Sequence, residues 1–369
     1  MKNLQTSSAR LKALLCRGAL LLAGALILAG CSTTRRIPQG EQLYVGLKKV
    51  EIVPPEGQKV PEGVQGQLNE AVAVPPNNAL FKSPYYRIPF PLGLWVYNNW
   101  DNPPKGLKHW LYEKFVTEPV LVSDVRPEVR TQMLDQILDN NGYFRGSASY
   151  ELIKLKNPKK ARISYNIKTG PAYTLDSIAL LPDTCHLNHL IDSIASRDPY
   201  LRRGERYSTD SLSAARIRIT NSLRNRGYYF FRPDYIEYLA DSLETPMEID
   251  LRMMLASNIP APMLRRYVTG DVTVYAFRNK GGGTPDTIVT PRATLIQMMP
   301  SRLRHKLIPE CVTFRQGKVF SVRDMNRTQT RLARLGIFNA IGIDVVPDSA
   351  MASNKLNVCL LYTSPSPRD

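Results

Sequence analysis

The sequence predicts an α+β fold in which one small module occurs three times in tandem. A seven-residue signature, Leu-x-x-x-Gly followed by Tyr or Ile and then by Phe or Tyr, begins at Leu138, Leu223 and Leu332. Each copy follows a segment with helical periodicity and precedes a segment that alternates like a strand. The copies lie about one small domain apart, so the repeat marks a folding unit and not the short period of a solenoid.

Each unit is predicted to have the order strand, helix, helix, strand, strand. Two amphipathic helices can cover one face of a three-stranded sheet, with the last two strands paired as a hairpin and the first strand in the third place. The signature glycine supplies the left-handed conformation that ends a helix, and the residue after it begins the hairpin. The residues that form these corners are Leu138, Gly142, Tyr143, Leu223, Gly227, Tyr228, Leu332, Gly336 and Ile337.

The first module is expected over residues 43–170. Its helices are predicted at 106–116 and 125–138. Its strands are predicted at 43–53, 147–155 and 161–167. The i, i+4, i+8 spacing of the second helix predicts an inward stripe formed by Val129, Met133 and Ile137.

An inserted, ordered loop is predicted at residues 54–106 of this module. Prolines recur from Val60 to Pro104 and are interleaved with aromatic residues from Tyr85 to Trp100. So much proline rules out a long regular element, and so much aromatic area must pack on something. Two interpretations stay open, a cover over the first core and a docking surface.

The second module, 171–256, and the third, 257–361, repeat the same order. In the second module the predicted elements are a strand at 173–181, helices at 189–195 and 208–223, and strands at 229–239 and 247–255. In the third they are a strand at 266–277, a turn at Gly281–Gly283, helical segments at 295–307 and 322–335, and strands at 341–345 and 356–360. Ser208 and Ser321 are the predicted N-caps of the longer helices.

Residues 1–30 have the features of a secretory signal peptide. A basic leader precedes an apolar run at 19–28, roughly half of the ~20 residues that a membrane-spanning helix needs. The run ends in Leu-Ala-Gly before Cys31, an order that resembles the lipobox of bacterial lipoproteins. This resemblance implies acylation of Cys31, palmitate included, and a lipidated tether over residues 31–42. The tether has no acidic residue before position 40, which in such families indicates the outer membrane and a chain facing the periplasm.

The chain carries a strong positive charge. Removal of the leader takes away four basic residues and lowers the net charge from +17 to +13. Partners that suit this charge in an envelope compartment are anionic lipid head groups, lipopolysaccharide phosphates and acidic client segments. Export argues against nucleic acid as a partner.

The remaining cysteines, Cys185, Cys311 and Cys359, allow at most one internal disulfide, for which Cys311 with Cys359 is a candidate pair. Cys185, His186 and His189 form a metal-like cluster but lack a second pair of ligands at a zinc-ribbon spacing.

No catalytic pattern is found elsewhere. The glycines at 281–283 are not followed by a phosphate-loop lysine, and Asp135 with Asp139 is more simply a solvated helix face. We therefore expect no enzyme activity, no cofactor and no metal.

The three signatures, with the junction Ile167-Lys-Thr-Gly-Pro-Ala-Tyr173, resemble the POTRA domains of the BamA/TamA outer-membrane assembly family. The lipobox followed by residues 34–41 resembles the TamL branch of lipoproteins. Members of that family continue into a sixteen-stranded β-barrel, which these residues do not supply. The run at 362–369 is expected to be foreign to the protein, so the chain is predicted to be a POTRA fragment lacking the barrel.

The resemblance implies a periplasmic region that binds unfolded outer-membrane proteins and accessory envelope proteins, attached to the outer membrane by its lipid anchor and by the missing barrel. Strand addition to the edges at 147–155 and 229–239 is the physical route. The same edges can also be protected edges without a client. The alternative is a free-standing envelope lipoprotein that binds glycan or peptidoglycan through the aromatic insertion.

Overall fold

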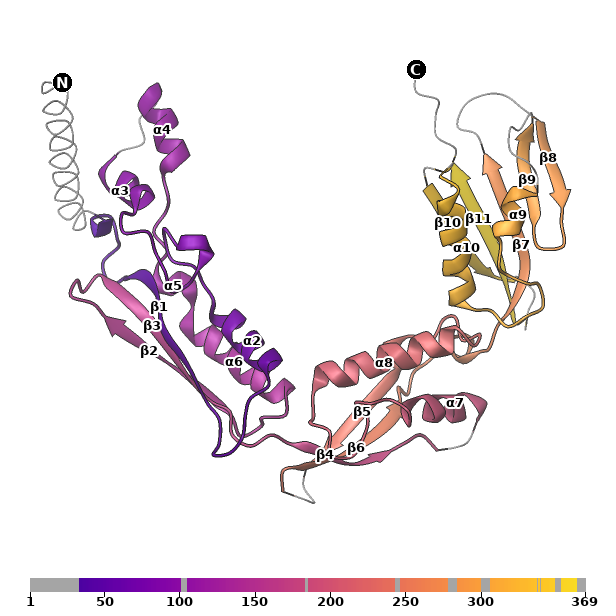
Figure 1. Ribbon diagram of the computed structural model, residues 1–369, viewed down its shortest axis with the longest axis horizontal. Helices are drawn as coiled ribbons and strands as arrows, with labels where there is room; N and C mark the ends of the chain where they lie inside the picture. Colours follow the sequence, from indigo (N-terminus) through magenta and orange to yellow (C-terminus); the bar gives the residue numbers. More distant parts are fainter. Residues whose placement is uncertain are drawn as a thin grey trace, which may run out of the picture. The chain divides into compact units, whose positions relative to one another are not determined.

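The structure, a computed structural model, falls into two compact units, Met1–Tyr173 and Thr174–Asp369 (Figure 1). The first contains one sheet and the second contains two. The residues described are 33–100, 105–182, 185–242, 246–277, 284–299, 306–336, 338, 340–348 and 353–363. The predicted signal peptide, Cys31, the glycine turn at 281–283, Ile337 and residues 364–369 of the predicted tail lie outside the described residues.

The first unit contains the predicted three-stranded sheet. Its strands are β1 (Leu43–Val53), β2 (Ser147–Lys154) and β3 (Lys160–Lys168), in the order β1-β3-β2. Strand β3 pairs parallel with β1 and antiparallel with β2, as the hairpin prediction requires. Helices α2 (Glu62–Val72) and α6 (Pro127–Asn140) cover one face, and their buried residues form a common core with the inward residues of the strands (Figure 1).

The predicted extent of the insertion, 54–106, is wrong, because α2 lies inside it and is the first helix of the module. Val64, Leu68 and Val72 recur at i, i+4, i+8 and are at most 3% exposed. The segment predicted as the first helix is instead α4 (Leu107–Phe115), which contributes nothing to this core. The true insertion separates α2 from α6 and contains η2 (Leu80–Lys82), α3 (Leu92–Asn99), α4 and α5 (Val122–Val125).

The predicted inward stripe of α6 is also corrected. Val129 and Met133 are 46% and 48% exposed, whereas Leu134 and Leu138 are fully buried. The two stripes lie on adjacent faces of the helix, and the signature residue Leu138 belongs to the face that meets the sheet. Ile137 lies at the border and is partly buried.

In the second unit, the first sheet has the order β4-β6-β5 and consists of β4 (Thr174–Ala179), β5 (Ile236–Asp241) and β6 (Glu248–Leu255). Its helices are α7 (His186–Ala195) and α8 (Thr209–Arg224), and Ser208 caps α8 through its side chain as predicted. The strand predicted at 229–239 begins only at Ile236, after η3 (Pro233–Tyr235). The residues before it are drawn out of the sheet because Tyr229 and Phe230 pack against the core of the next module.

The third module has a five-stranded sheet and not the predicted three-stranded one. Its strand order is β10-β11-β7-β9-β8. The strands are β7 (Val268–Phe277), β8 (Thr284–Val289), β9 (Thr294–Met299), β10 (Ala340–Pro347) and β11 (Lys355–Thr363), and the helices are α9 (Leu307–Cys311) and α10 (Val322–Arg334).

Two predictions for the third module change as a result. The helical segment expected at 295–307 begins as β9, where Leu295 and Gln297 alternate inward and the backbone bonds with β7 and β8. The first helix is thereby reduced to the five residues of α9. The tail expected at 362–369 begins inside β11, whose Tyr362 pairs with Ile341.

Candidate interaction surfaces

The signature glycines form corners of the modules, and two of them, Gly142 and Gly227, bond to the residue that precedes the next sheet. Gly142, Gly227 and Gly336 have φ of 79°, 99° and 64°, and the signature leucines before them are fully buried. The carbonyl of Gly142 accepts the N–H of Tyr173 at 2.8 Å, and that of Gly227 accepts the N–H of Tyr267 at 2.8 Å. Each tyrosine directly precedes the first strand of a sheet, a regularity that the sequence shows but that our prediction did not use.

Aromatic rings pack over these corners. Phe144 lies edge-on to Tyr173 at 5.1 Å, and Phe230 lies edge-on to Tyr267 at 5.4 Å between ring centroids. Tyr143 and Tyr228, which follow the glycines, are 3% and 4% exposed. The corners therefore combine a backbone hydrogen bond with an aromatic pair.

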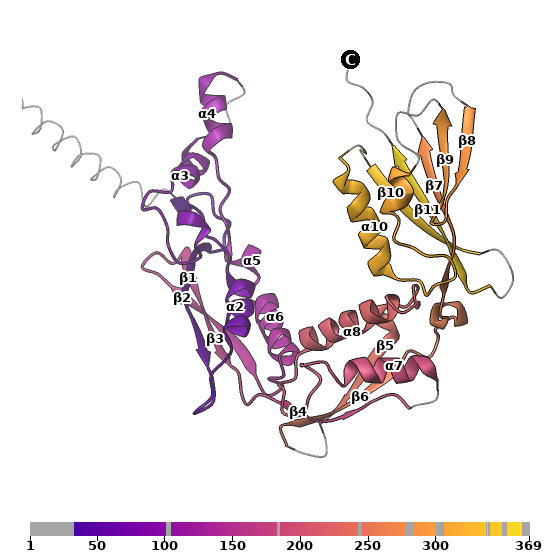
Figure 2. The same ribbon diagram turned by 45° about the vertical axis from the view of Figure 1, so that its right-hand side comes forward.

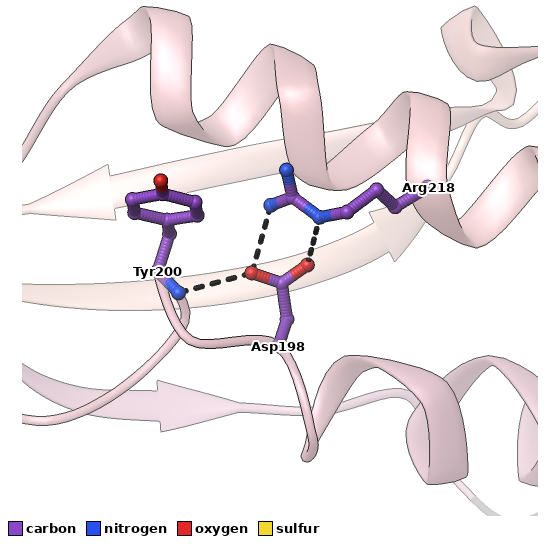
Figure 3. Close-up of polar contacts among 3 residues, drawn as sticks. All are labelled: Asp198, Tyr200 and Arg218. Carbon is purple, nitrogen blue, oxygen red and sulfur yellow. Dashed lines mark hydrogen bonds and ion pairs between the residues drawn. The ribbon is translucent and has the colours of Figure 1, made fainter.

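A partly buried ion pair joins the loop after α7 to α8 (Figure 3). The Arg218 guanidinium donates to Asp198 through Nε at 2.6 Å and through a terminal nitrogen at 2.8 Å. The Tyr200 N–H donates to the same carboxylate at 3.0 Å, and the Arg218 carbon Cζ lies 5.0 Å from the centre of the Tyr200 ring. The hydrogen bond that Arg218 donates to Asp198, together with the charge of that carboxylate, raises the pKa of Arg218. We assign this pair a structural role, because the Asp198 carboxylate and the Arg218 guanidinium form hydrogen bonds to each other.

The sheet orders place β2 and β5 at free edges. The opposite edges, formed by the first strands, are partly covered by backbone bonds from loops. The Leu47 N–H of β1 donates to Pro84 and the Leu175 N–H of β4 donates to Glu205, at 2.9 and 2.8 Å. We therefore expect an added strand at β2 or β5 and not at β1 or β4.

Alternate residues of β2 direct their backbone groups towards β3, and the residues between them direct theirs outward. The N–H of Leu155, just past the strand, donates to the carbonyl of Lys160, so odd-numbered residues face β3. The N–H of Ala148 points the other way and is capped by Asp135 Oδ1 at 2.7 Å. The outward amides that follow in register are those of Tyr150, Leu152 and Lys154.

The same reasoning shows a shorter free edge on β5. The Ala256 N–H donates to Tyr235, and the Ile236 N–H turns back to Pro233. Outward amides therefore belong to Tyr238 and Ala240. Since β2 offers three outward amides and β5 offers two, β2 is the better template for an added strand.

Arginines line two clefts that share α10. A cleft of about 840 Å³ lies between Asn221 and Asn225 at the end of α8 and the face of α10. A second, of about 400 Å³, has Arg327 and Arg331 in common with the first and includes Asp324. The basic residues lining the two clefts are Arg292, Arg315, Lys318, Arg323, Arg327, Arg331 and Arg334. This surface suits an anionic partner.

The tether is held against the insertion of the first module. Ile37 joins a small apolar cluster with Leu43 and Val45 of β1 and Leu94 of α3. The Arg36 N–H donates to Asn98 Oδ1 at 2.8 Å, and Asn98 Nδ2 donates to the Thr33 carbonyl at 3.1 Å. The chain is thus fixed to α3 within two residues of the predicted lipidation site, Cys31, which itself lies outside the described residues.

The cysteines of the described residues form no disulfide. Cys185, Cys311 and Cys359 are free, and the predicted Cys311–Cys359 pairing is not made. Cys311 packs against the helix-covered core, whereas Cys359 alternates with the inward residues Val358 and Leu360 and faces the other side of the sheet. In the part of the chain that the structure describes, no three metal-ligating side chains gather and no helix has the length and apolar content of a membrane span.

The solved structures to which this chain is similar contain POTRA domains. No protein-family model and no curated protein matches the sequence. POTRA domains 3–5 of Haemophilus influenzae BamA match 90% of this chain and 100% of theirs, at 12% identity and a TM-score of 0.39. POTRA domains 1–3 of Omp85 from Anabaena match 89% and 98%, at 14% identity and a TM-score of 0.26. The sheets of this chain themselves define three small α+β modules in tandem, in each of which the first strand lies beside the last.

Proposed function

We propose that the chain is the periplasmic POTRA region of an outer-membrane assembly or translocation protein of the BamA/TamA family, in its TamL-like lipoprotein branch. It has no enzymatic role and binds extended segments of unfolded outer-membrane proteins by adding them to a sheet edge. The single observation that carries the proposal is the free edge of β2, with outward amides at three alternate positions. Domain limits at 43–170, 171–256 and 257–361 belong to the same proposal.

The experiment uses the outward amide of Leu152, in the middle of that edge. Leu152→Pro removes this donor without removing a bond to β3, because the lost N–H faces solvent. Leu152→Ala is the matched control, since it trims the same side chain and keeps the amide. The full chain is immobilised, and a urea-unfolded outer-membrane protein is diluted over it.

Capture should weaken about tenfold for Leu152→Pro, because one or two backbone bonds of about 0.5–1.5 kcal/mol each are lost. Leu152→Ala should capture as the parent chain does. Equal capture by the proline and alanine variants would reject strand addition at β2.

The proposed anchor at Cys31 has its own measurement. Intact-mass analysis of the chain isolated from bacterial envelopes should show the acylated form beginning at residue 31. A mature chain with an unmodified cysteine would remove the anchor from the proposal and leave the client-binding test unaffected.

The alternative, a glycan-binding lipoprotein, depends on the aromatic insertion. Trp95 lies against Phe90 and Trp100 at 6.5 and 6.0 Å between ring centroids, so part of its aromatic surface is used within the insertion. Tyr86, 70% exposed, is the most exposed aromatic residue between Tyr85 and Trp100. Co-sedimentation with peptidoglycan that is lost on Tyr86→Ala would favour this alternative.

A further inference from the structure

Helix α4 exposes several of its apolar side chains. Leu107 is 73% exposed, Trp110 52% and Phe115 41%, and none of its side chains that the structure describes is buried. In both views α4 projects from one end of the first unit, away from the sheet of β1, β2 and β3 (Figures 1 and 2). Because a helix of a globular domain normally buries its apolar stripe, this one requires another cover.

The charges around α4 are those of a helix that lies at a lipid surface. Residues 105–115 contain three lysines and one glutamate. The Lys114 ammonium lies 4.8 Å from the centre of the Trp110 ring, and Lys105 is exposed at the start of the segment. Tryptophan favours the level of the head groups, and lysine stems extend along apolar surface towards phosphates.

The tether places α4 next to the membrane that an acylated Cys31 would occupy. Thr33 is 1% exposed, and its carbonyl accepts a hydrogen bond from Asn98 of α3. Helix α3 in turn packs against α4. Two residues of chain span at most about 7 Å, so acyl chains on Cys31 would hold a bilayer close to α3. With nine residues, α4 is about 13.5 Å long, about twice the reach of those two residues.

We infer that α4 lies in the interface of an anionic bilayer, with Leu107 and Trp110 among the acyl chains, and is a second attachment of the first unit to the membrane. The inference rests on the proposed acylation of Cys31. Two contacts with the bilayer would orient the first unit, which a single anchor would not do.

The test uses the mature chain carrying Cys31→Ser, so that acyl chains cannot contribute to binding. Flotation is measured with phosphatidylethanolamine–phosphatidylglycerol vesicles and with phosphatidylcholine vesicles. The double variant Leu107→Ser, Trp110→Ser removes the proposed contact, and Trp110→Phe keeps its apolar character. Val289→Ser, which removes a 78% exposed apolar side chain from β8 in the second unit, is the matched control.

The Cys31→Ser chain should float with the anionic vesicles, and the double variant should bind them at least about tenfold more weakly. Trp110→Phe and Val289→Ser should bind as the parent does, and all variants should melt alike because the changed side chains are exposed. Equal flotation of the parent and the double variant, whether both bind or neither does, overturns the inference. Acylation of Cys31 is measured separately by mass, so failure of the anchor and failure of α4 are distinguishable.

Discussion

Removal of the Asp198 carboxylate should loosen α8 from the loop that follows α7. The side chain of Asp198 is 4% exposed and accepts three hydrogen bonds, two from Arg218 and one from the Tyr200 backbone. Asp198→Ala leaves all three donors without this acceptor. The same module offers a matched exposed pair, Arg203 with Asp176 at 2.6 Å, in which the arginine is 80% exposed.

The magnitude follows from the exposure of the donors. Hydrogen bonds to a charged group contribute about 1.5–3 kcal/mol each when buried. Arg218 is 40% exposed and regains water in the variant, so its two bonds must be discounted. We expect a cost of about 2–3 kcal/mol for Asp198→Ala and at most about 0.5 kcal/mol for Arg203→Ala.

Hydrogen exchange followed by mass spectrometry measures this effect locally, which matters because a chain of several modules does not unfold in two states. Amides of α8 should exchange about 30- to 150-fold faster in Asp198→Ala. If α8 in Asp198→Ala exchanges within about twofold of the parent, or if Arg203→Ala accelerates it equally, the reasoning from burial is refuted.

Gly227→Ala should lower the free energy of unfolding of the second unit by about 2 kcal/mol, because a Cβ at φ 99° would lie 2.8 Å from the Tyr267 carbonyl oxygen. An unchanged melting curve would contradict this. Burial raises the pKa of Tyr165 to about 12, above about 10 in the unfolded chain, so its stabilisation is complete below pH 10 and is lost between pH 10 and 12. Between pH 10 and 12, the free energy of unfolding of Tyr165→Phe should therefore fall by about 2–3 kcal/mol less than that of the parent chain. An equal fall in the two chains would argue against this. Replacing Arg327 and Arg331 by Glu should make the chain elute from a heparin column at clearly lower salt, whereas unchanged elution would show that the α10 clefts do not bind anions.

The signature corners could be predicted from the sequence because their cause is local. A glycine that ends a helix needs positive φ whatever surrounds it, and Gly142, Gly227 and Gly336 all have it. The order of strands and helices and the hairpin of the last two strands follow from the same local signals. The α+β class and the three modules were accordingly correct.

Errors arose where two local patterns competed. On α6, Val129 and Met133 form as regular a stripe as Leu134 and Leu138, and only contact with the sheet decides between them. Helix α2 was missed because three apolar residues in a polar segment, close to a proline-rich stretch, are a weak signal. The β8–β9 hairpin was missed because β9 is held by pairing with β7, which is distant in sequence.

The sequence by itself determined the repeated module, its glycine corners and the proposed lipid anchor, since each depends on a few adjacent residues. Tertiary structure alone decided which backbone amides of β2 face outward, which apolar face of α6 is buried, and that α4 remains uncovered beside the tether. These properties depend on strand register and on contacts between residues far apart in the chain, such as Thr33 with Asn98, and no local pattern encodes them.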